Sequence, residues 1–173
     1  MSKVKNPKLA KQGKIAYEWA RTHMDILDNT LNRLKKSKPL KGVTVAFCLH
    51  ITKETSVLVM GAKELGANVA VCGGNPLTTQ DHIAAFLATQ GIHIYAWNGQ
   101  TNKEYDWCIE QVLSHKPSLI CDDGADMNVK VHFDKKFKSL KVLGSTEETT
   151  AGVTRVRAME KQGKLKYPVI IVN

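Results

Sequence analysis

The sequence lacks several patterns that mark common protein classes. None of its four cysteines has CxxC spacing, and its six histidines form neither HxxxH nor HExxH. We therefore expect buried, reduced thiols and no bound metal, rather than a disulfide framework or a zinc site. No apolar run approaches the ~20 residues of a membrane span. No apolar signal segment begins the chain, so we expect a cytoplasmic protein without membrane contact.

Glycine-rich phosphate loops are missing as well. Neither GxGxxG nor GxxxxGK[ST] occurs in the 173 residues, which argues against a dinucleotide site or a P-loop in this chain. Apolar residues make up 43% and charged residues 24% of the sequence. These values are typical of a soluble globular protein and exclude a mostly disordered or collagen-like chain.

Positive charge is concentrated in one segment. The formal net charge is +9, and residues 1–42 hold 11 Lys and Arg against 3 Asp and Glu. A basic arm suits nucleic acid. This arm, however, has few aromatics for stacking on bases and contains no recognisable RNA- or DNA-binding module. We favour a solvated helix face or a partner contact over nucleic-acid binding.

The apolar pattern alternates between strand and helix periods. Residues 1–13 are expected to be a frayed lead-in, and residues 14–36 a helix that ends before Pro39. Further strands are expected at 43–48, 68–72, 92–97, 118–122, 141–144 and 169–172, with helices at 52–65, 79–90, 103–114 and 147–162. Short apolar runs separated by helices predict a parallel sheet that is covered on both faces.

The predicted fold class is α/β: a doubly wound, mostly parallel sheet of the Rossmann-like or flavodoxin-like kind, with an N-terminal helix. Residues 1–37 form the basic lead-in and helix, and residues 38–173 form the α/β domain. Ligands of such folds bind beyond the carboxyl ends of the strands. Four predicted strands end in polar or acidic residues, at 49–52, 73–75, 122–124 and 145–149. The sequence therefore predicts a polar small-molecule site at this edge.

The first polar strand end contains His50, Thr52 and Glu54. In a structural interpretation, Thr52 caps the following helix and Glu54 favours its positive end. In a functional interpretation, the hydroxyl and the carboxylate hydrogen-bond a ligand. The loop of residues 73–82 has the same two interpretations, as a turn with a helix cap or as part of the site.

Two acidic clusters follow later strands. Asp122, Asp123 and Asp126 form the first cluster, which suits a divalent metal, a base with a raised pKa, or a helix N-terminus. Glu147 and Glu148 begin the second. We expect both clusters to face one cleft, where a carboxylate can bind the vicinal diol of a ribose.

Six strings in this chain resemble the S-adenosyl-L-homocysteine hydrolase family. They occur in the family's order and spacing, from about Lys38 to the last residue. The strings are LHITKET (49–55), NPLTTQDH (75–82), EYDWCIEQ (104–111), CDDGADM (121–127), GSTEETTAGV (144–153) and GKLKYPVIIVN (163–173).

The resemblance implies roles for individual residues. It implies three catalytic residues, namely His50, Asp123 and Glu148. It also implies substrate contacts from Thr52 and Glu54 to adenine, from Thr149 together with Glu148 to ribose, and from Thr78, which stands where many members have Ser. Cofactor contacts are implied for Thr149 and Thr150. Ala151 replaces a third Thr of many members, so one such contact is missing here.

The family reaction is the reversible hydrolysis of S-adenosyl-L-homocysteine to adenosine and L-homocysteine in the methyl cycle. In the family, NAD oxidises and later reduces the ribose 3′-carbon, and a separate domain with GxGxxG holds that cofactor. The NAD-binding domain and the segment with the catalytic lysine are absent from this sequence. We therefore expect no tight cofactor binding and no turnover by this chain alone.

Three interpretations stay open. The chain is a truncated form of the enzyme, one subunit of a split enzyme, or a free-standing, non-catalytic binding or interaction module. The expected ligands are adenosine and S-adenosyl-L-homocysteine. The expected protein partner is an NAD-binding chain or a second copy of this chain.

Overall fold

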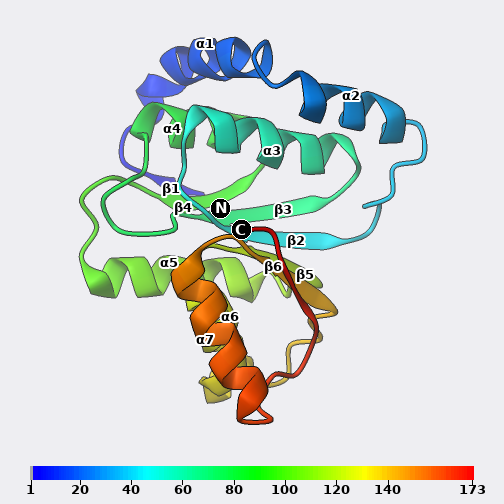
Figure 1. Cartoon of the computed structure of the whole chain (residues 1–173). Helices are drawn as coiled ribbons and strands as arrows, with labels where there is room; N and C mark the ends of the chain where they lie inside the picture. Colours follow the sequence, from blue (N-terminus) through cyan, green and yellow to red (C-terminus); the bar gives the residue numbers. More distant parts are fainter. Residues whose placement is uncertain (1) are drawn as a thin grey trace.

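The predicted parallel sheet is present in the computed structural model, which describes residues 2–173 (Figure 1). Seven strands lie in the order β1-β4-β3-β2-β5-β6-β7, and every pair is parallel. The strands are β1 (Lys3–Val4), β2 (Thr44–Cys48), β3 (Asn68–Cys72), β4 (His93–Ala96), β5 (Leu119–Asp122), β6 (Gly144–Glu147) and β7 (Val169–Ile171). The doubly wound α/β prediction is thereby confirmed.

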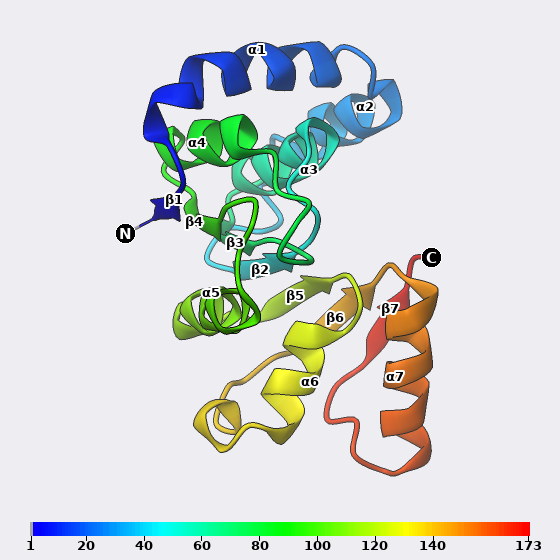
Figure 2. The same cartoon turned by 90° about the vertical axis from the view of Figure 1, so that its left-hand side faces the viewer.

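Seven α-helices surround this sheet. They are α1 (Ala10–Arg21), α2 (Asp25–Leu34), α3 (Lys53–Glu64), α4 (Asp81–Thr89), α5 (Asn102–Ser114), α6 (Asp126–Phe133) and α7 (Thr150–Lys161). Figure 2 shows α1 to α4 on one face of the sheet and α5 to α7 on the other. Among residues 2–173, no helix is both long and apolar enough to cross a membrane.

The core forms two layers because side chains of a strand alternate between the faces of the sheet. Phe47 and Val71 are buried on the face that α1, α3 and α4 cover. Cys48 and Cys72 are buried on the opposite face, against Cys108 and its neighbours on α5. All four cysteines are free and three are buried, which agrees with the expectation of reduced thiols.

The chain reverses its direction across the sheet between β2 and β5. From β2 it winds through α3, β3 and α4 to β4, and then it returns through α5 to β5 and continues outward through β6 to β7. The strands β2 and β5 are neighbours, and the loops that follow them run toward opposite sides of the sheet. Such a switch point is where open α/β sheets bind their ligands.

The N-terminal prediction was wrong in two respects. Residues 3–4 are not frayed, because β1 pairs with β4. The helix expected over residues 14–36 is two helices, α1 and α2, with a break between Arg21 and Asp25. The Arg21 guanidinium stabilises this break, since it bonds Asp28 at 3.0 Å and Glu64 at 2.6 Å.

Near the C-terminus, the predicted elements were displaced along the chain. The strand expected at residues 141–144 is β6, Gly144–Glu147, and α7 begins at Thr150 rather than at residue 147. The sequence GSTE is polar and contains no apolar run, so it does not predict a strand. Only the pairing with β5 and β7 defines β6. Helix α6 begins at Asp126, which agrees with the interpretation of the acidic cluster as a helix N-terminus, and α4 begins at Asp81 instead of residue 79.

Candidate functional site

His50 lies at the switch point and connects two of the polar loops. Its Nε2 is 3.0 Å from Asp123 Oδ2, in the loop after β5. Its Nδ1 is 2.6 Å from Thr78 Oγ1, in the loop after β3. A carboxylate accepts hydrogen bonds, so it is the Nε2 tautomer of the ring that donates to Asp123, and in that tautomer Nδ1 accepts from the Thr78 hydroxyl. Thr78 and Asp123 thus both contact the His50 ring, and the three residues come from three separate strings of the sequence.

Exposure differs between the two members of this pair. The His50 side chain is 40% exposed, whereas that of Asp123 is 6% exposed. The buried carboxylate therefore orients the ring from the protein side, and the ring is partly exposed to solvent. An imidazole held in this way is suited to exchange a proton with a bound ligand.

Gly74 allows the loop after β3 to approach this pair. A Cβ at this position would lie 3.1 Å from the His50 backbone nitrogen and 3.2 Å from Asp123 Oδ2. The same loop is tied to the end of β2, because the Gln80 amide donates to the Ile51 carbonyl at 2.9 Å. The Gln80 side-chain oxygen also accepts from the Lys53 amide at 3.1 Å. These contacts close the loop down over the switch point.

The N-terminus of α3 carries two further candidates. Thr52 caps the helix, since its hydroxyl accepts from the Thr55 amide at 3.2 Å. Glu54 lies in the first turn with a side chain that is 52% exposed, and Lys53 Nζ is 3.4 Å away. Partial burial acts to raise the pKa of Glu54, but hydrogen bonds from its own backbone and from Thr52, with the Lys53 charge, lower that pKa below its usual value. Glu54 is therefore an ionised acceptor.

The acidic strand ends do not all face the open edge, contrary to the prediction. Asp122 and Glu147 are the last residues of β5 and β6, they lie in register, and both are buried. Glu147 Oε1 accepts from the amides of Gly124 at 2.8 Å and Thr149 at 3.1 Å, and from the Thr149 hydroxyl at 3.1 Å. Glu147 Oε2 has no partner among the described residues. The two buried carboxyl groups therefore accept hydrogen bonds from backbone amides of the segments that follow β5 and β6.

Burial dominates the titration of Asp122 and raises its pKa to about 7, although amide donors from the Asn128 backbone oppose this shift. The folded chain therefore binds a proton that the unfolded chain releases near pH 4. The contribution of this group to the free energy of unfolding is complete at low pH and is lost as the pH rises toward 7.

We expect Asp122→Asn to remove that decline, as measured by urea unfolding between pH 4.5 and pH 7.5. The exposed Asp25→Asn is the matched control, and an unchanged pH slope in the Asp122 variant would contradict the assignment.

The loop after β6 places its residues differently. Glu148 is exposed, and its backbone amide donates to the Asp122 carbonyl at 3.1 Å. The Thr149 hydroxyl is already engaged, because it donates to Glu147 and accepts from the Gly152 amide at 3.2 Å. Thr150 is the exposed first residue of α7. Glu148 thus offers an exposed carboxylate at the rim, one residue beyond the buried Glu147.

Tyr105 on α5 is a residue that the sequence interpretation did not select. Its hydroxyl lies 3.0 Å from both the Gly74 carbonyl and Asp126 Oδ2, so it connects the loop after β3 to the start of α6. Burial raises the Tyr105 pKa well above its usual value. Asp126, a metal candidate in the sequence, instead bonds Arg155 at 2.6 Å. No cluster of three potential metal ligands occurs within residues 2–173.

The N-termini of α3 and α7 and the glycine loop after β3 are bonded to or closed by the chain's own side chains. The backbone N–H groups at the start of α3 are bonded to Thr52 and Gln80, and those near the start of α7 to Glu147 and Thr149. The Gly73 Cβ position would already contact Thr79 Oγ1 at 3.1 Å, so the glycine loop is closed by its own side chains. A pyrophosphate needs a free helix N-terminus and an open glycine turn.

The chain is a doubly wound α/β domain with polar loops at the switch point of its sheet, the position at which open α/β sheets bind their ligands. Residues 1–143 match the family model described as S-adenosyl-L-homocysteine hydrolase, and the chain belongs to this family. The resemblance seen in the sequence is thereby confirmed.

Curated relatives carry two different names. The chain is 49% identical to an adenosylhomocysteinase of Sulfurisphaera tokodaii over 171 residues, which cover 99% of the chain and 41% of that protein. It is 46% identical to an S-inosyl-L-homocysteine hydrolase of Methanopyrus kandleri, over 98% of the chain and 40% of that protein. The chain thus spans about two fifths of the length of the curated relatives it matches.

Proposed function

We propose that this chain is the nucleoside-binding part of an S-adenosyl-L-homocysteine hydrolase. The observation that carries the proposal is the pair formed by His50 and Asp123, 3.0 Å apart at the switch point of the sheet. In this proposal residues 38–173 form the substrate-binding domain, and residues 1–37 form its helical lead-in. The ligands are adenosine and S-adenosyl-L-homocysteine, in the cytoplasm.

Each site residue has a proposed role. His50, oriented by Asp123, exchanges a proton near the thioether end of the ligand, and Thr78 holds the second ring nitrogen. The exposed Glu148 carboxylate accepts from the ribose hydroxyls, with Thr149 beside it. Thr52 and Glu54 contact the adenine ring from the start of α3.

The whole family reaction needs more than this chain. We propose that hydrolysis to adenosine and L-homocysteine requires NAD, and that the NAD is held by the part of the relatives' sequence outside the segment that this chain matches. Thr149 and Thr150 would contact that cofactor only from the edge. The chain alone is expected to bind ligand weakly and to catalyse no turnover.

Glu54 favours an adenosyl ligand over an inosyl ligand. An ionised carboxylate accepts hydrogen bonds, and the exocyclic amine of adenine donates them. Hypoxanthine presents a carbonyl oxygen at the same ring position, which a carboxylate repels. The names of the relatives include both substrates and do not decide between them. The carboxylate of Glu54 supports the adenosyl ligand.

Isothermal titration calorimetry tests this proposal. Adenosine and S-adenosyl-L-homocysteine are titrated into the chain with and without NAD+. We expect saturable binding to the wild-type chain, little effect of NAD+, and loss of binding in Glu148→Ala. Glu18→Ala, on the exposed surface of α1, is the matched control because it also removes one exposed carboxylate.

Absence of heat with either ligand would contradict the proposal. It would favour the alternative of a non-catalytic interaction module derived from the same domain. Circular dichroism of each variant, recorded beforehand, separates a lost site from a lost fold.

A further inference from the structure

The loop after β3, residues 73–80, is held in two halves. The Gly99 amide donates to the Pro76 carbonyl at 3.0 Å. The Gln80 amide donates to the Ile51 carbonyl at 2.9 Å. These two bonds fix the second half of the loop, whereas the first half lies directly against the candidate site and depends on other contacts.

Tyr105 of α5 holds the first half of this loop. Its hydroxyl donates to the Gly74 carbonyl at 3.0 Å, from the face of the sheet that α5 covers. A second contact, from Cys48 Sγ to the Gly73 carbonyl, is 3.5 Å long, and a thiol is a weak donor. The phenol therefore makes the stronger of these two bonds.

The Tyr105 hydroxyl has a second acceptor, which competes for its single proton. This acceptor is Asp126 Oδ2, also at 3.0 Å. Arg155 of α7 donates to the other oxygen of the same carboxylate, Oδ1, at 2.6 Å. Because Arg155 supplies a donor to Asp126, the proton of the phenol is left for the Gly74 carbonyl.

The position of Gly74 determines what surrounds the His50 ring. The Gly74 backbone is in close contact with the His50 backbone nitrogen and with Asp123 Oδ2. Thr78, whose hydroxyl is 2.6 Å from His50 Nδ1, follows four residues later in the same loop. A shift of Gly74 therefore moves the loop relative to both nitrogens of the ring.

We propose that Tyr105 is a positioning residue of the candidate site. Its hydroxyl holds the loop after β3 so that Thr78 and Asp123 stay at the two nitrogens of the His50 ring. Arg155 supports this bond by engaging the competing carboxylate. The use of the ring on a nucleoside rests on the proposed function, whereas the geometry of the ring can be tested without it.

Acylation by diethyl pyrocarbonate tests the inference in the absence of a nucleoside. The reagent attacks the ring nitrogen that has a lone pair, which in the Nε2 tautomer of His50 is Nδ1, and the Thr78 hydroxyl covers this atom. We expect Tyr105→Phe to speed the acylation of His50 by about 10-fold, measured by peptide mapping, because the loop opens more often. Thr78→Ala uncovers Nδ1 directly and should speed it at least as much.

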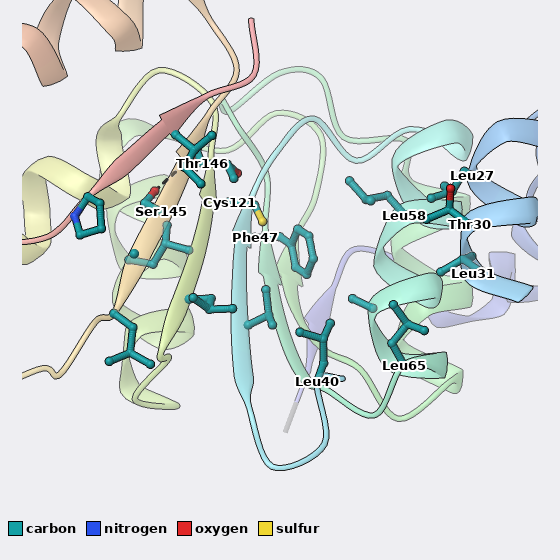
Figure 3. A pocket seen from close by; sticks show the side chains of 18 residues that line it. Leu27, Thr30, Leu31, Leu40, Phe47, Leu58, Leu65, Cys121, Ser145 and Thr146 are labelled. Atoms are coloured by element: carbon teal, nitrogen blue, oxygen red, sulfur yellow. Dashed lines mark hydrogen bonds between the residues drawn. The ribbon is translucent and has the colours of Figure 1, made fainter. Parts of the chain in front are cut away.

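Two variants serve as matched controls. Tyr17→Phe also removes a tyrosine hydroxyl, one that accepts from Arg21 at 2.9 Å on α1. Leu58→Ala removes an apolar side chain from the wall of a pocket of about 520 Å³ on the α3 face, and none of its lining residues belongs to the loop of residues 73–80 (Figure 3). Both variants should leave the acylation rate of His50 unchanged.

Arg155 provides a second, milder test, because its side chain is 42% exposed and its replacement leaves the core intact. Arg155→Met leaves Asp126 to attract the Tyr105 proton, so acylation of His50 should again be faster. Arg155→Lys retains a cation for Asp126 and should keep the slow rate. This pair also decides the question if Tyr105→Phe does not fold.

Unchanged acylation of His50 in Tyr105→Phe, beside faster acylation in Thr78→Ala, would overturn the inference. Equal acceleration in Tyr17→Phe would overturn it as well, because the loss of any hydroxyl would then have the same effect. Adenosine titration is evaluated separately, and Tyr105→Phe should weaken binding by about 10-fold. A wild-type chain that binds no adenosine contradicts the proposed function, and the acylation rates still decide the role of Tyr105.

Discussion

Gly152→Ala is expected to lower the free energy of unfolding by about 3 kcal/mol or more. A Cβ at position 152 would lie 2.0 Å from Glu147 Oε1 and 2.3 Å from its carboxyl carbon. Glu147 is fully buried and is held by the Gly124 and Thr149 amides, so it moves only by leaving those donors unpaired. Replacing glycine by alanine inside an exposed helix normally stabilises it by about 1 kcal/mol. The sign of the change therefore shows which effect prevails.

Urea unfolding at fixed pH measures this effect. Gly144→Ala is the matched control, because its Cβ would meet its nearest neighbour, the Pro168 carbonyl, at an ordinary contact distance of 3.4 Å. A Gly152 variant as stable as the wild type would mean that Glu147 is not fixed against α7. In that case the loop carrying Glu148 and Thr149 would lack its support.

Much of the fold follows from local sequence. Strands β2 and β3 are continuous apolar runs, and the helices that follow them end at glycines with positive φ, so their order and type are predictable. Strand β6 is not, because GSTE is polar and only pairing defines it. The break between α1 and α2 depends on a bond from Arg21 to Glu64, 43 residues away, which no local pattern contains.

The candidate site shows the same division. Parallel strands end at one edge, so the sequence predicts that the loops containing His50 and Asp123 meet there. The strand pattern alone does not indicate which of two adjacent acids faces the edge, and only the family resemblance selects Asp123 and Glu148. That choice depends on where each strand ends: Asp122 and Glu147 are the last strand residues and point inward, while the next residue of each pair begins the loop. A shift of one residue reverses the assignment.

Glu54→Gln is expected to change the preference between adenosine and inosine. Removing an ionised acceptor from a hydrogen bond costs about 1.5–3 kcal/mol, so the affinity for adenosine should fall roughly 10- to 100-fold. The glutamine amide can donate to the carbonyl oxygen of hypoxanthine, so the affinity for inosine should rise. Competition calorimetry with the two nucleosides measures both changes.

The position of Glu54 makes this test specific. Its charge is balanced by Lys53, whose Nζ lies 3.4 Å away and 4.2 Å from the centre of the Trp19 ring. Neutralising Glu54 therefore leaves Lys53 anchored on Trp19, and the fold should be unaffected. Glu18→Gln removes an exposed carboxylate of α1, which pairs with Lys14, and should leave the ratio of the two affinities unchanged. A wild-type chain that binds inosine more tightly than adenosine would reverse the assignment, because a carboxylate that reads the amine cannot prefer the carbonyl.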